Sequence, residues 1–309
     1  MASVYASALA AAREAAGNQH YPQGALYVVA TPIGNLADIS LRALHVLQVV
    51  DCIACEDTRH TQTLLRAYGR DRNGSQLLAL HQHNEAQAAQ TVIDRLQQGQ
   101  RVAYVSDAGT PGISDPGARL AATVAALQLP VVPLPGASSV TALLSVAGVG
   151  SDSEHQHGFI FQGFLPAKAG ERTQAITQLA GEHRAVVLLE APHRIEALAA
   201  GLAVLGERRV TVGRELTKQF EEIATVPART LPAWFAEQPN RVRGEFALVL
   251  HPAPVTAEAG RELVVLKLLL AELPLKTAVK LAADITGHGR NELYEAALAM
   301  KKQGADDDV

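Results

Sequence analysis

The chain has 309 residues, of which 48% are hydrophobic and 19% charged, a composition that predicts a soluble globular protein and excludes a disordered one. Its net charge of −4 excludes a globally basic nucleic-acid-binding protein, so any RNA contact must come from a local patch. No apolar run reaches the roughly 20 residues of a membrane span. The only cysteines, Cys52 and Cys55, favour a reducing, cytoplasmic compartment.

Residues 1–23 are rich in alanine but lack the apolar core of a signal peptide, and they predict a frayed, partly helical tail. From residue 24 to 150, strands alternate with helices, which predicts a first α/β domain with a mostly parallel sheet. Its expected strands span 25–30, 51–56, 77–80, 101–105 and 130–134. Its first expected helix begins near residue 38 or 40. The other expected helices cover 58–68, 85–96, 116–127 and 139–147.

A polar, glycine-containing stretch at 148–158 marks a domain boundary, and a second α/β domain is expected over 151–252. Its later strands follow one another without long helices, so its sheet should be mixed. The expected strands are 159–161, 185–190, 209–214, 221–226 and 245–250, with helices at 171–180 and 194–205. Beyond a Pro/Ala linker, residues 261–302 predict three helices with a helix-turn-helix-like connection at 286–290.

The stretch 102–117 predicts a buried strand, a loop of small residues and a helix capped by Asp115 with Pro116 at its start. Such a loop can bring its backbone close to a ligand, because no bulky side chain intervenes. Strand ends of this kind are where open α/β sheets bind ligands. The alternative is an ordinary turn between a strand and a helix.

Glu56, Asp57 and Arg59 follow the end of another predicted strand. A carboxylate there could act as a general base, and Arg59 could hold a phosphate in a bidentate manner. The alternative is structural, with Asp57 capping a helix and the other two forming ion pairs.

No metal site is predicted. Cys52 and Cys55 match C-x-x-C, but three residues apart on a strand they would point to opposite faces, as buried structural thiols. His81 and His83 lack a partner carboxylate motif. The usual nucleotide and zinc signatures, including G-x-G-x-x-G and H-E-x-x-H, are absent from the sequence.

Seven stretches in order resemble one known family: TPIGNL (31–36), EDTR (56–59), SDAGTP (106–111), PGASS (135–139), GFLP (163–166), APHR (191–194) and RELTK (214–218). Each is weak alone, but together they closely resemble the ribosomal small subunit methyltransferase I family, of the tetrapyrrole-methylase fold. The resemblance runs from about Leu26 to Met300.

This resemblance implies two α/β domains with a donor-binding cleft between them, a C-terminal helical appendage and a homodimer. It implies S-adenosyl-L-methionine-dependent 2′-O-methylation of cytidine 1402 in 16S rRNA of the small (30S) subunit, with no metal and no membrane. The donor wall carried over by motif comprises Thr31, Pro32, Gly34, Asp107, Ala108, Gly109, Thr110, Pro111, Pro135, Gly136, Ala137 and Ser138. A helix cap is an alternative role for Ser138.

RNA contacts are expected from Arg194 and Lys218, among the second-domain candidates Glu190, His193, Arg194, Arg214, Glu215 and Lys218. Residues 261–302 contain seven basic and five acidic side chains. Their local charge of +2 suits docking to an RNA backbone. Lys276, Lys280 and Arg290 are the chief candidates there, and a plain packing appendage is the alternative.

Two other functions stay open. One is a tetrapyrrole or other small-molecule methyltransferase on the same fold. The other is a non-catalytic RNA-binding factor in ribosome assembly. Donor binding and methyl transfer to 30S particles would separate them.

Overall fold

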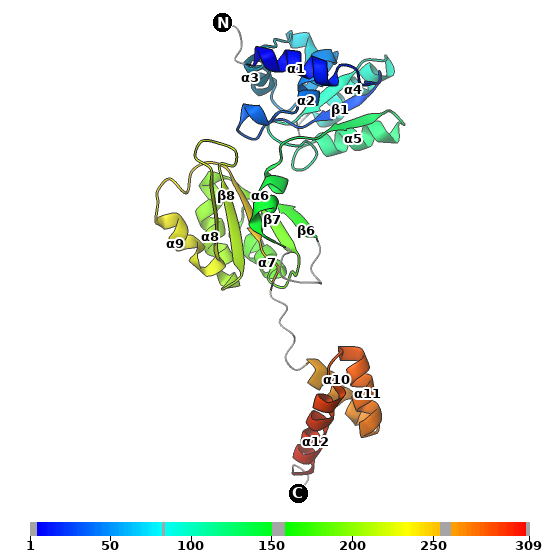
Figure 1. Cartoon of the computed structure of the whole chain (residues 1–309), viewed down its shortest axis with the longest axis vertical. Coiled ribbons are helices and arrows are strands. Elements are labelled where there is room, and N and C mark those ends of the chain that lie inside the picture. Colours follow the sequence, from blue (N-terminus) through cyan, green and yellow to red (C-terminus); the bar gives the residue numbers. More distant parts are fainter. Residues whose placement is uncertain (1–4, 82–83, 150–157, 254–260, 307–309) are drawn as a thin grey trace. The chain divides into compact units, whose positions relative to one another are not determined.

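The computed structural model describes residues 5–81, 84–149, 158–253 and 261–306. It divides into two compact units, Met1–Ala253 and Pro254–Val309, shown in Figure 1. The predicted boundary at 150 and most of the predicted linker, 254–260, lie outside the described residues.

The first sheet of the larger unit is fully parallel, in agreement with the alternating pattern of strands and helices. Its strands are β1 (Leu26–Val29), β2 (Cys52–Cys55), β3 (Leu77–Ala79), β4 (Val102–Val105) and β5 (Val131–Leu134), in the order β3-β2-β4-β1-β5. Apolar residues of α2 (Leu41–Val49) and α3 (Thr58–Ala67) pack on one face. Those of α4 (Glu85–Gln97) and α5 (Gly117–Ala126) pack on the other.

The strand order places a topological switch point between β1 and β4. The chain leaves β1 toward β2 on one side of the pair and leaves β4 toward β5 on the other side. The connections after the two adjacent strands therefore diverge at their carboxyl ends. Open α/β sheets bind ligands at such a switch point.

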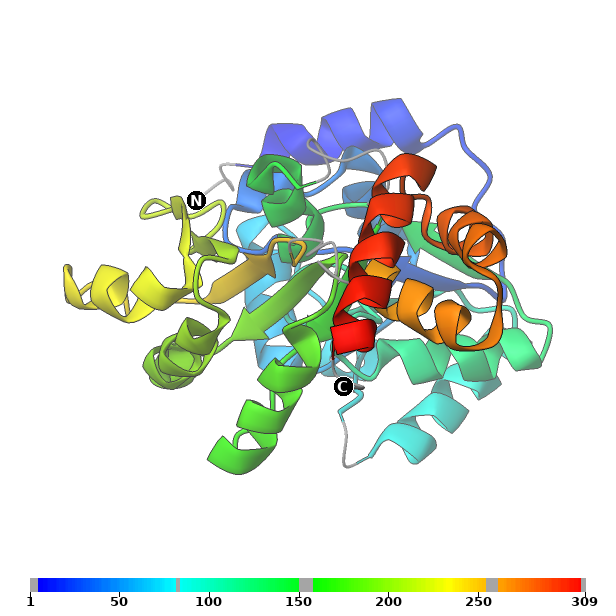
Figure 2. The ribbon, with the colours of Figure 1, turned by 90° about the horizontal axis from the view of Figure 1, so that it is seen from below.

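The segment before β1 is more ordered than the expected frayed tail. Residues Ala6–Ala16 form α1, the dark-blue helix of Figures 1 and 2, which packs against α2. Ala12 and Ala16 are buried, and Ala12 shares a small core with Leu44 and Tyr68. Alanine is a strong helix former whose small side chain permits close helix contact, which explains why this segment docks.

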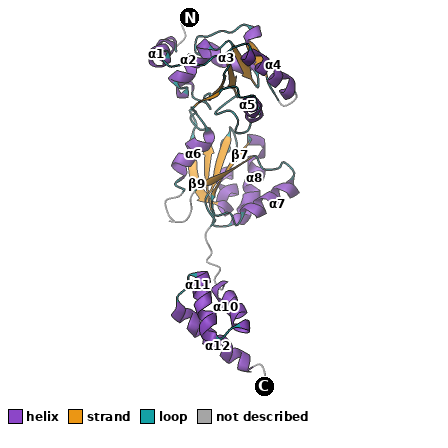
Figure 3. Ribbon diagram, turned by 90° about the vertical axis from the view of Figure 1, so that its right-hand side faces the viewer, coloured by secondary structure: helices purple, strands orange, loops and turns teal. Residues whose placement is uncertain are grey.

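The second sheet is mixed, as expected. Its strands are β6 (Phe159–Gly163), β7 (Ala185–Glu190), β8 (Arg209–Arg214), β9 (Glu222–Pro227) and β10 (Phe246–Leu250), in the order β6-β7-β10-β8-β9. Only β6 and β7 pair in parallel, and the remaining pairs are antiparallel. Figure 3 shows the strands of the two sheets in orange.

Helices cover both faces of this second sheet. Apolar residues of α7 (Ala169–Leu179), α8 (Ile195–Leu202) and α9 (Leu231–Ala236) share one core with it. Helix α6 (Ser139–Ala147) packs on the opposite face. This differs from the predicted assignment of 139–147 to the first domain, because Val140 and Leu143 contribute to the second sheet's core.

The smaller unit consists of three helices around a core of its own, coloured orange to red in Figure 2: α10 (Arg261–Glu272), α11 (Leu275–Thr286) and α12 (Arg290–Asp306). Gly287 ends α11 in a left-handed conformation with φ of +74°. Within the described residues, no helix combines the length and apolar character that crossing a membrane requires.

Candidate functional site

Three loops at the carboxyl edge of the first sheet are tied to one another. Thr31, after β1, exchanges two backbone hydrogen bonds with Gly109, after β4, at N···O distances of 3.0 and 3.1 Å. The Thr110 hydroxyl donates to the Ala137 carbonyl, after β5, at 3.0 Å. The three loops predicted to contact the donor therefore lie together.

Asp115 holds the loop after β4 in its conformation. Its carboxylate accepts hydrogen bonds from the Tyr104 hydroxyl at 3.0 Å and from the backbone N–H groups of Gly112 and Gly117 at 2.7 and 2.8 Å. Helix α5 begins at Gly117 with Pro116 in the N-cap position, one residue later than predicted, and Asp115 accepts the hydrogen bond from the N–H of its first residue from outside the cap position. Gly109 has φ of +81°, a region that side chains with a Cβ atom rarely adopt.

A cavity of about 320 Å³ opens beside these loops. Four of the predicted donor residues line it: Ala108, Gly109, Thr110 and Ser138. The other predicted donor residues belong to the same loops but are not part of the cavity lining: Thr31, Pro32, Gly34, Asp107, Pro111, Pro135, Gly136 and Ala137. Thr31 and Ala137 still shape the wall through the hydrogen bonds above.

The opposite wall comes from the half of the unit that contains the second sheet, and most of its residues were not predicted. It comprises Phe164, Leu189, Glu190, Ala191, Pro192, Leu216, Glu245, Phe246 and Ala247. The loops after β1 and β4 add Ile33, Ile113 and Ser114, and the start of α6 adds Ser139 and Val140. Most of these side chains are apolar or small, so nothing in their sequence pattern separates them from core residues. Glu190 is the exception, because it is a carboxylate at the end of an apolar strand.

Glu190 brings a buried carboxylate to the cavity, with only 3% of the residue exposed. Its Oε1 lies 3.0 Å from Arg194 Nε and accepts a hydrogen bond from the Ala191 N–H, also at 3.0 Å. Its Oε2 is buried without a hydrogen-bond partner. A buried carboxylate oxygen without a hydrogen-bond partner favours a ligand that supplies an N–H or O–H group or a positive charge.

The stretch Glu56–Arg59 adjoins the loop after β4, because β2 and β4 are neighbouring strands. The Asp107 N–H donates to Glu56 Oε1 at 3.2 Å, and the Asp57 N–H donates to Asp107 Oδ1 at 3.3 Å. Burial raises the pKa of Glu56, an effect that the hydrogen bond from Asp107 partly offsets. None of Glu56, Asp57 and Arg59 belongs to the cavity lining.

Asp57 has the structural role that was weighed for it. Its carboxylate caps α3 by accepting from the Arg59 N–H at 2.8 Å, and it pairs with the Arg59 guanidinium at 2.9 Å. These contacts lower the pKa of Asp57 to about 2. The two adjacent carboxylates thus differ in character, since one is a weak acid and the other is held ionised.

Both second-domain cations proposed for RNA are already paired. Arg194 contacts Glu190 and donates to the Leu165 carbonyl. Lys218 Nζ lies 2.9 Å from both Glu215 Oε1 and Glu245 Oε2. Neither charge is therefore free to bind a phosphate without breaking a contact.

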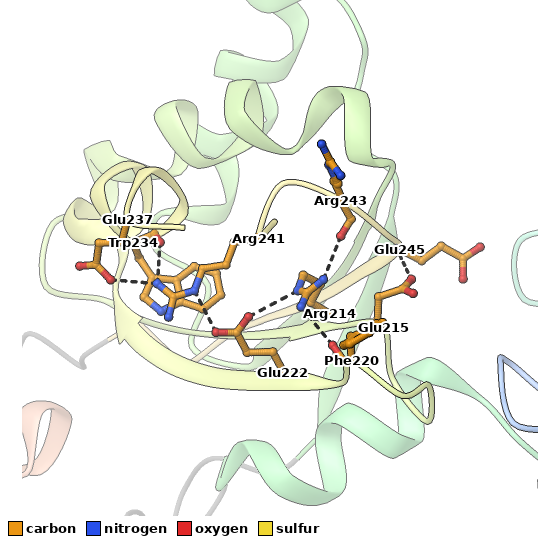
Figure 4. Close-up of polar contacts among 9 residues, drawn as sticks. All are labelled: Arg214, Glu215, Phe220, Glu222, Trp234, Glu237, Arg241, Arg243 and Glu245. Carbon is orange, nitrogen blue, oxygen red and sulfur yellow. Dashed lines mark hydrogen bonds and ion pairs between the residues drawn. The ribbon is translucent and has the colours of Figure 1, made fainter. Parts of the chain in front are cut away.

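The loop between β8 and β9 is held by a network of charges, shown in Figure 4. Glu222 bridges Arg214 at 3.4 Å and Arg241 at 2.8 Å, and Arg241 stacks over the Trp234 ring at 4.2 Å. Glu215 accepts from the Glu245 N–H at 3.0 Å and has a positive φ of 51°. This network explains the charged RELTK stretch as support for the cavity wall, to which Leu216 and Glu245 contribute.

The three residues of the C-terminal unit that were predicted to contact RNA differ in their ion pairing. Lys276 and Lys280 are exposed on α11 and form no ion pair with another described residue. Arg290, at the start of α12, pairs with Asp284 at 2.9 Å. The lysines are therefore the freer cations of this unit.

The cysteines lie as predicted. Cys55 and Cys52 are buried on opposite faces of β2, in different cores, and both are free thiols. Across the described ranges no group of three or more His, Cys, Asp or Glu side chains is placed to hold a metal ion. His83 lies outside those ranges.

The fold and the cavity define the class of this protein. Residues 25–232 match the family model of the tetrapyrrole (corrin/porphyrin) methylases. Solved structures with this fold include cobalt precorrin-4 methyltransferase CbiF, with a TM-score of 0.54 and 17% identity over 75% of this chain and 98% of that one. Diphthine synthase also has a TM-score of 0.54, with 14% identity over 74% of this chain and 90% of that one. The predicted α/β fold is confirmed.

More similar relatives narrow the assignment. A protein of Escherichia coli O157:H7 is 48% identical over 90% of this chain and 96% of its own length. A protein of Pseudomonas aeruginosa is also 48% identical, over 91% of this chain and 98% of its own length. Both are named ribosomal RNA small subunit methyltransferase I, and residues 256–301 match the RsmI C-terminal HTH domain. The chain belongs to this family of S-adenosylmethionine-dependent methyltransferases, and it is an enzyme of that kind.

Proposed function

We propose that the protein methylates the ribose 2′-hydroxyl of cytidine 1402 in 16S rRNA, within the small (30S) ribosomal subunit, in the cytoplasm. The observation that carries this proposal is the pairing of a methylase fold with the C-terminal helical unit, along nearly the full length of relatives that bear this name. That unit argues against a tetrapyrrole or other small-molecule acceptor. The enzyme family argues against a non-catalytic assembly factor.

The cavity residues fit S-adenosyl-L-methionine as the donor. This molecule supplies a methyl group on a positively charged sulfur, and it also carries an adenine amino group, a ribose and an ammonium. The backbone of Ala108–Thr110 offers close polar contacts to such a ligand. The free Oε2 of Glu190 would accept a hydrogen bond from an amino or ammonium group, and its charge favours a cation.

Glu56 is the better of the two candidate bases. It is partly buried beside Asp107, the residue before Ala108 of the cavity wall, and its raised pKa makes its carboxylate a stronger proton acceptor. Asp57, with a pKa of about 2 and its oxygens bound to Arg59, is a poor one. We therefore assign to Glu56 the removal of the proton from the ribose hydroxyl.

This assignment predicts a pH profile. Methyl transfer should slow as the pH falls through the pKa of Glu56, above the ordinary value of 4.5, because only the carboxylate accepts a proton. Glu56→Gln should remove this decrease in rate, the acid limb of the pH profile, and should lower kcat by about 10²- to 10⁴-fold. A raised pKa stabilises the fold only at low pH, and this stabilisation is lost as the pH rises through it. The amide should therefore not reduce stability at pH 7.

Asp57→Asn is the matched control, because asparagine also caps helices and the pKa of Asp57 lies far below the expected limb. The assignment is wrong if Glu56→Gln retains the limb that the wild type shows.

The function itself is tested by incubating 30S subunits that lack the modification with radiolabelled donor. We expect incorporation of one methyl group per subunit, at the 2′-oxygen of cytidine 1402, and much less on naked 16S rRNA. Labelling of a tetrapyrrole instead, or donor binding without transfer to either RNA substrate, would support one of the rival functions.

We also propose that the protein is a homodimer with twofold symmetry, the commonest arrangement of soluble oligomers. Light scattering at micromolar concentration should then give about twice the 32.7 kDa mass of one chain. A mass close to that of the single chain would contradict the proposal.

A further inference from the structure

A second concave surface lies beside the candidate catalytic stretch and shares no residue with the donor cavity. This surface, here called the α3 groove, has a volume of about 610 Å³. It is lined by Thr58, Arg59, Gln62, Thr63, Arg66, Arg72, Gly74, Leu77 and Ala79. The five α3 residues among them fall on one side of the helix, next to the face that carries the buried Thr61 and Leu65.

The lining carries three arginines and no carboxylate, in a chain whose net charge is −4. The side chains of Arg59 and Arg66 are 90% and 64% exposed. Arg72 is anchored, because it donates to the carbonyls of Leu47 and Val50 at the end of α2. Two of the three charges are thus exposed to solvent, and the third is fixed in position.

The nearby carboxylates do not close the groove. Asp57 pairs with Arg59, and Asp71 lies 3.5 Å from Arg66 and accepts a hydrogen bond from Gln62 Nε2. Both ion pairs are at the surface, where such pairs contribute little. A phosphate, which offers several charged oxygens, can therefore compete with either carboxylate for its arginine.

Two of the lining residues also carry polar atoms that lack partners. Gln62 Oε1 and Arg72 Nε are buried without a hydrogen bond. One is an acceptor and the other a donor, so a ligand that offers both kinds of group suits these residues best. A sugar–phosphate backbone does so, since its phosphate oxygens accept and its 2′-hydroxyls donate.

We propose that the α3 groove binds the phosphodiester backbone of RNA next to the methylated nucleotide. This inference rests on the proposed function, because α3 begins directly after Glu56 and Asp57, and a strand held along it would pass the candidate base. Its contacts position the RNA and read no sequence. The groove supplies the local basic patch that the overall charge of the chain does not.

The test uses the full chain with Arg59→Gln and Arg66→Gln, singly and together. The double variant should raise the KM for 30S subunits about tenfold or more, because charge-assisted hydrogen bonds are lost. The slope of log KM against log salt should fall by about 1.4, or about 0.7 for each lost phosphate contact. Donor affinity, measured by calorimetry, should not change with Arg66→Gln.

Two exposed arginines in comparable ion pairs serve as matched controls. Arg184 pairs with Glu182 two residues away, as Arg59 does with Asp57, and Arg229 pairs with Glu207. Arg184→Gln and Arg229→Gln should leave both the KM and the salt slope at their wild-type values. Equal effects from control and groove variants would mean a general charge effect and would overturn the inference.

A direct binding measurement separates this inference from the proposed function. A fluorescent single-stranded RNA oligonucleotide should bind the wild type more tightly than the double variant, and inorganic pyrophosphate should compete only weakly. If 30S subunits are not methylated but RNA binding still depends on Arg59 and Arg66, the proposed function fails and the groove stands. RNA binding that is equal in wild type and double variant, or a site that takes pyrophosphate in preference to RNA, would overturn the groove.

Discussion

Replacing Gly109 with valine should lower the affinity for S-adenosyl-L-methionine by about 100-fold or more. Gly109 has φ of +81°, where a β-branched residue is strained by about 1–3 kcal/mol. A Cβ atom there would lie 3.3 Å from Ile33 Cγ2, and both residues line the cavity. The variant can relieve the strain only by moving the loop, which breaks its two hydrogen bonds to Thr31.

Gly99 provides the control, because it has the same φ of +81° and nothing within 4 Å of its Cβ position. Gly99→Val should incur similar backbone strain in the turn before β4 while leaving donor affinity unchanged. Calorimetry on the two variants, with thermal unfolding of each, separates loss of the site from loss of stability. Wild-type affinity in Gly109→Val would refute the assignment of the cavity.

Removal of Pro254–Val309 should leave donor binding within about twofold of wild type and lower kcat/KM for 30S subunits by about 100-fold. The larger unit retains both of its sheets and their cores, and the deleted helices have a core of their own. Lys276 and Lys280 are exposed cations that can contact phosphates remote from the methylated site. Their loss should weaken the subunit complex and flatten its salt dependence.

Point variants make this prediction sharper. Lys276→Gln with Lys280→Gln should raise the KM for the subunit, whereas Lys168→Gln, at an exposed lysine paired with Glu171 in the larger unit, should not. Arg290→Gln should act in the same direction, because the pair of Arg290 with Asp284 is at the surface and does not prevent a phosphate contact. If the truncated protein methylates subunits at the wild-type rate, the three helices have no part in holding RNA.

The course of the chain was predictable wherever local signals agree with the tertiary structure. Buried apolar runs such as 185–190 predict strands, and a capping residue such as Ser40 before α2 predicts the start of a helix. Helix α9 was missed because Pro232 lies inside a short segment, where it is tolerated in the first turn. The docking of α1 and of α6 could not be foreseen, because it depends on which surface each helix meets and not on its own pattern.

The site was predictable on one side only. Loops of glycine, proline and small polar residues identify the first wall of the cavity, through Gly109 and its neighbours. The second wall uses Leu189, Phe246 and Ala247, whose sequence context is that of any buried strand. The motifs APHR and RELTK led to Arg194 and Lys218 as RNA contacts, since a sequence shows the cations of a protein but not the carboxylates that already pair with them.

The two thiols on β2 have a practical consequence for experiments. Burial raises the pKa of Cys55 to about 11 and raises that of Cys52 as well. At pH 7 only about one Cys55 in 10⁴ is a thiolate, the form that reacts with maleimides. A cysteine introduced at Lys267, which is exposed on α10 and is not an expected RNA contact, and another at Arg184 should therefore accept dyes while the native pair stays unmodified. Energy transfer between the dyes would then follow the two units of the enzyme as it engages a ribosomal particle, in an otherwise natural sequence.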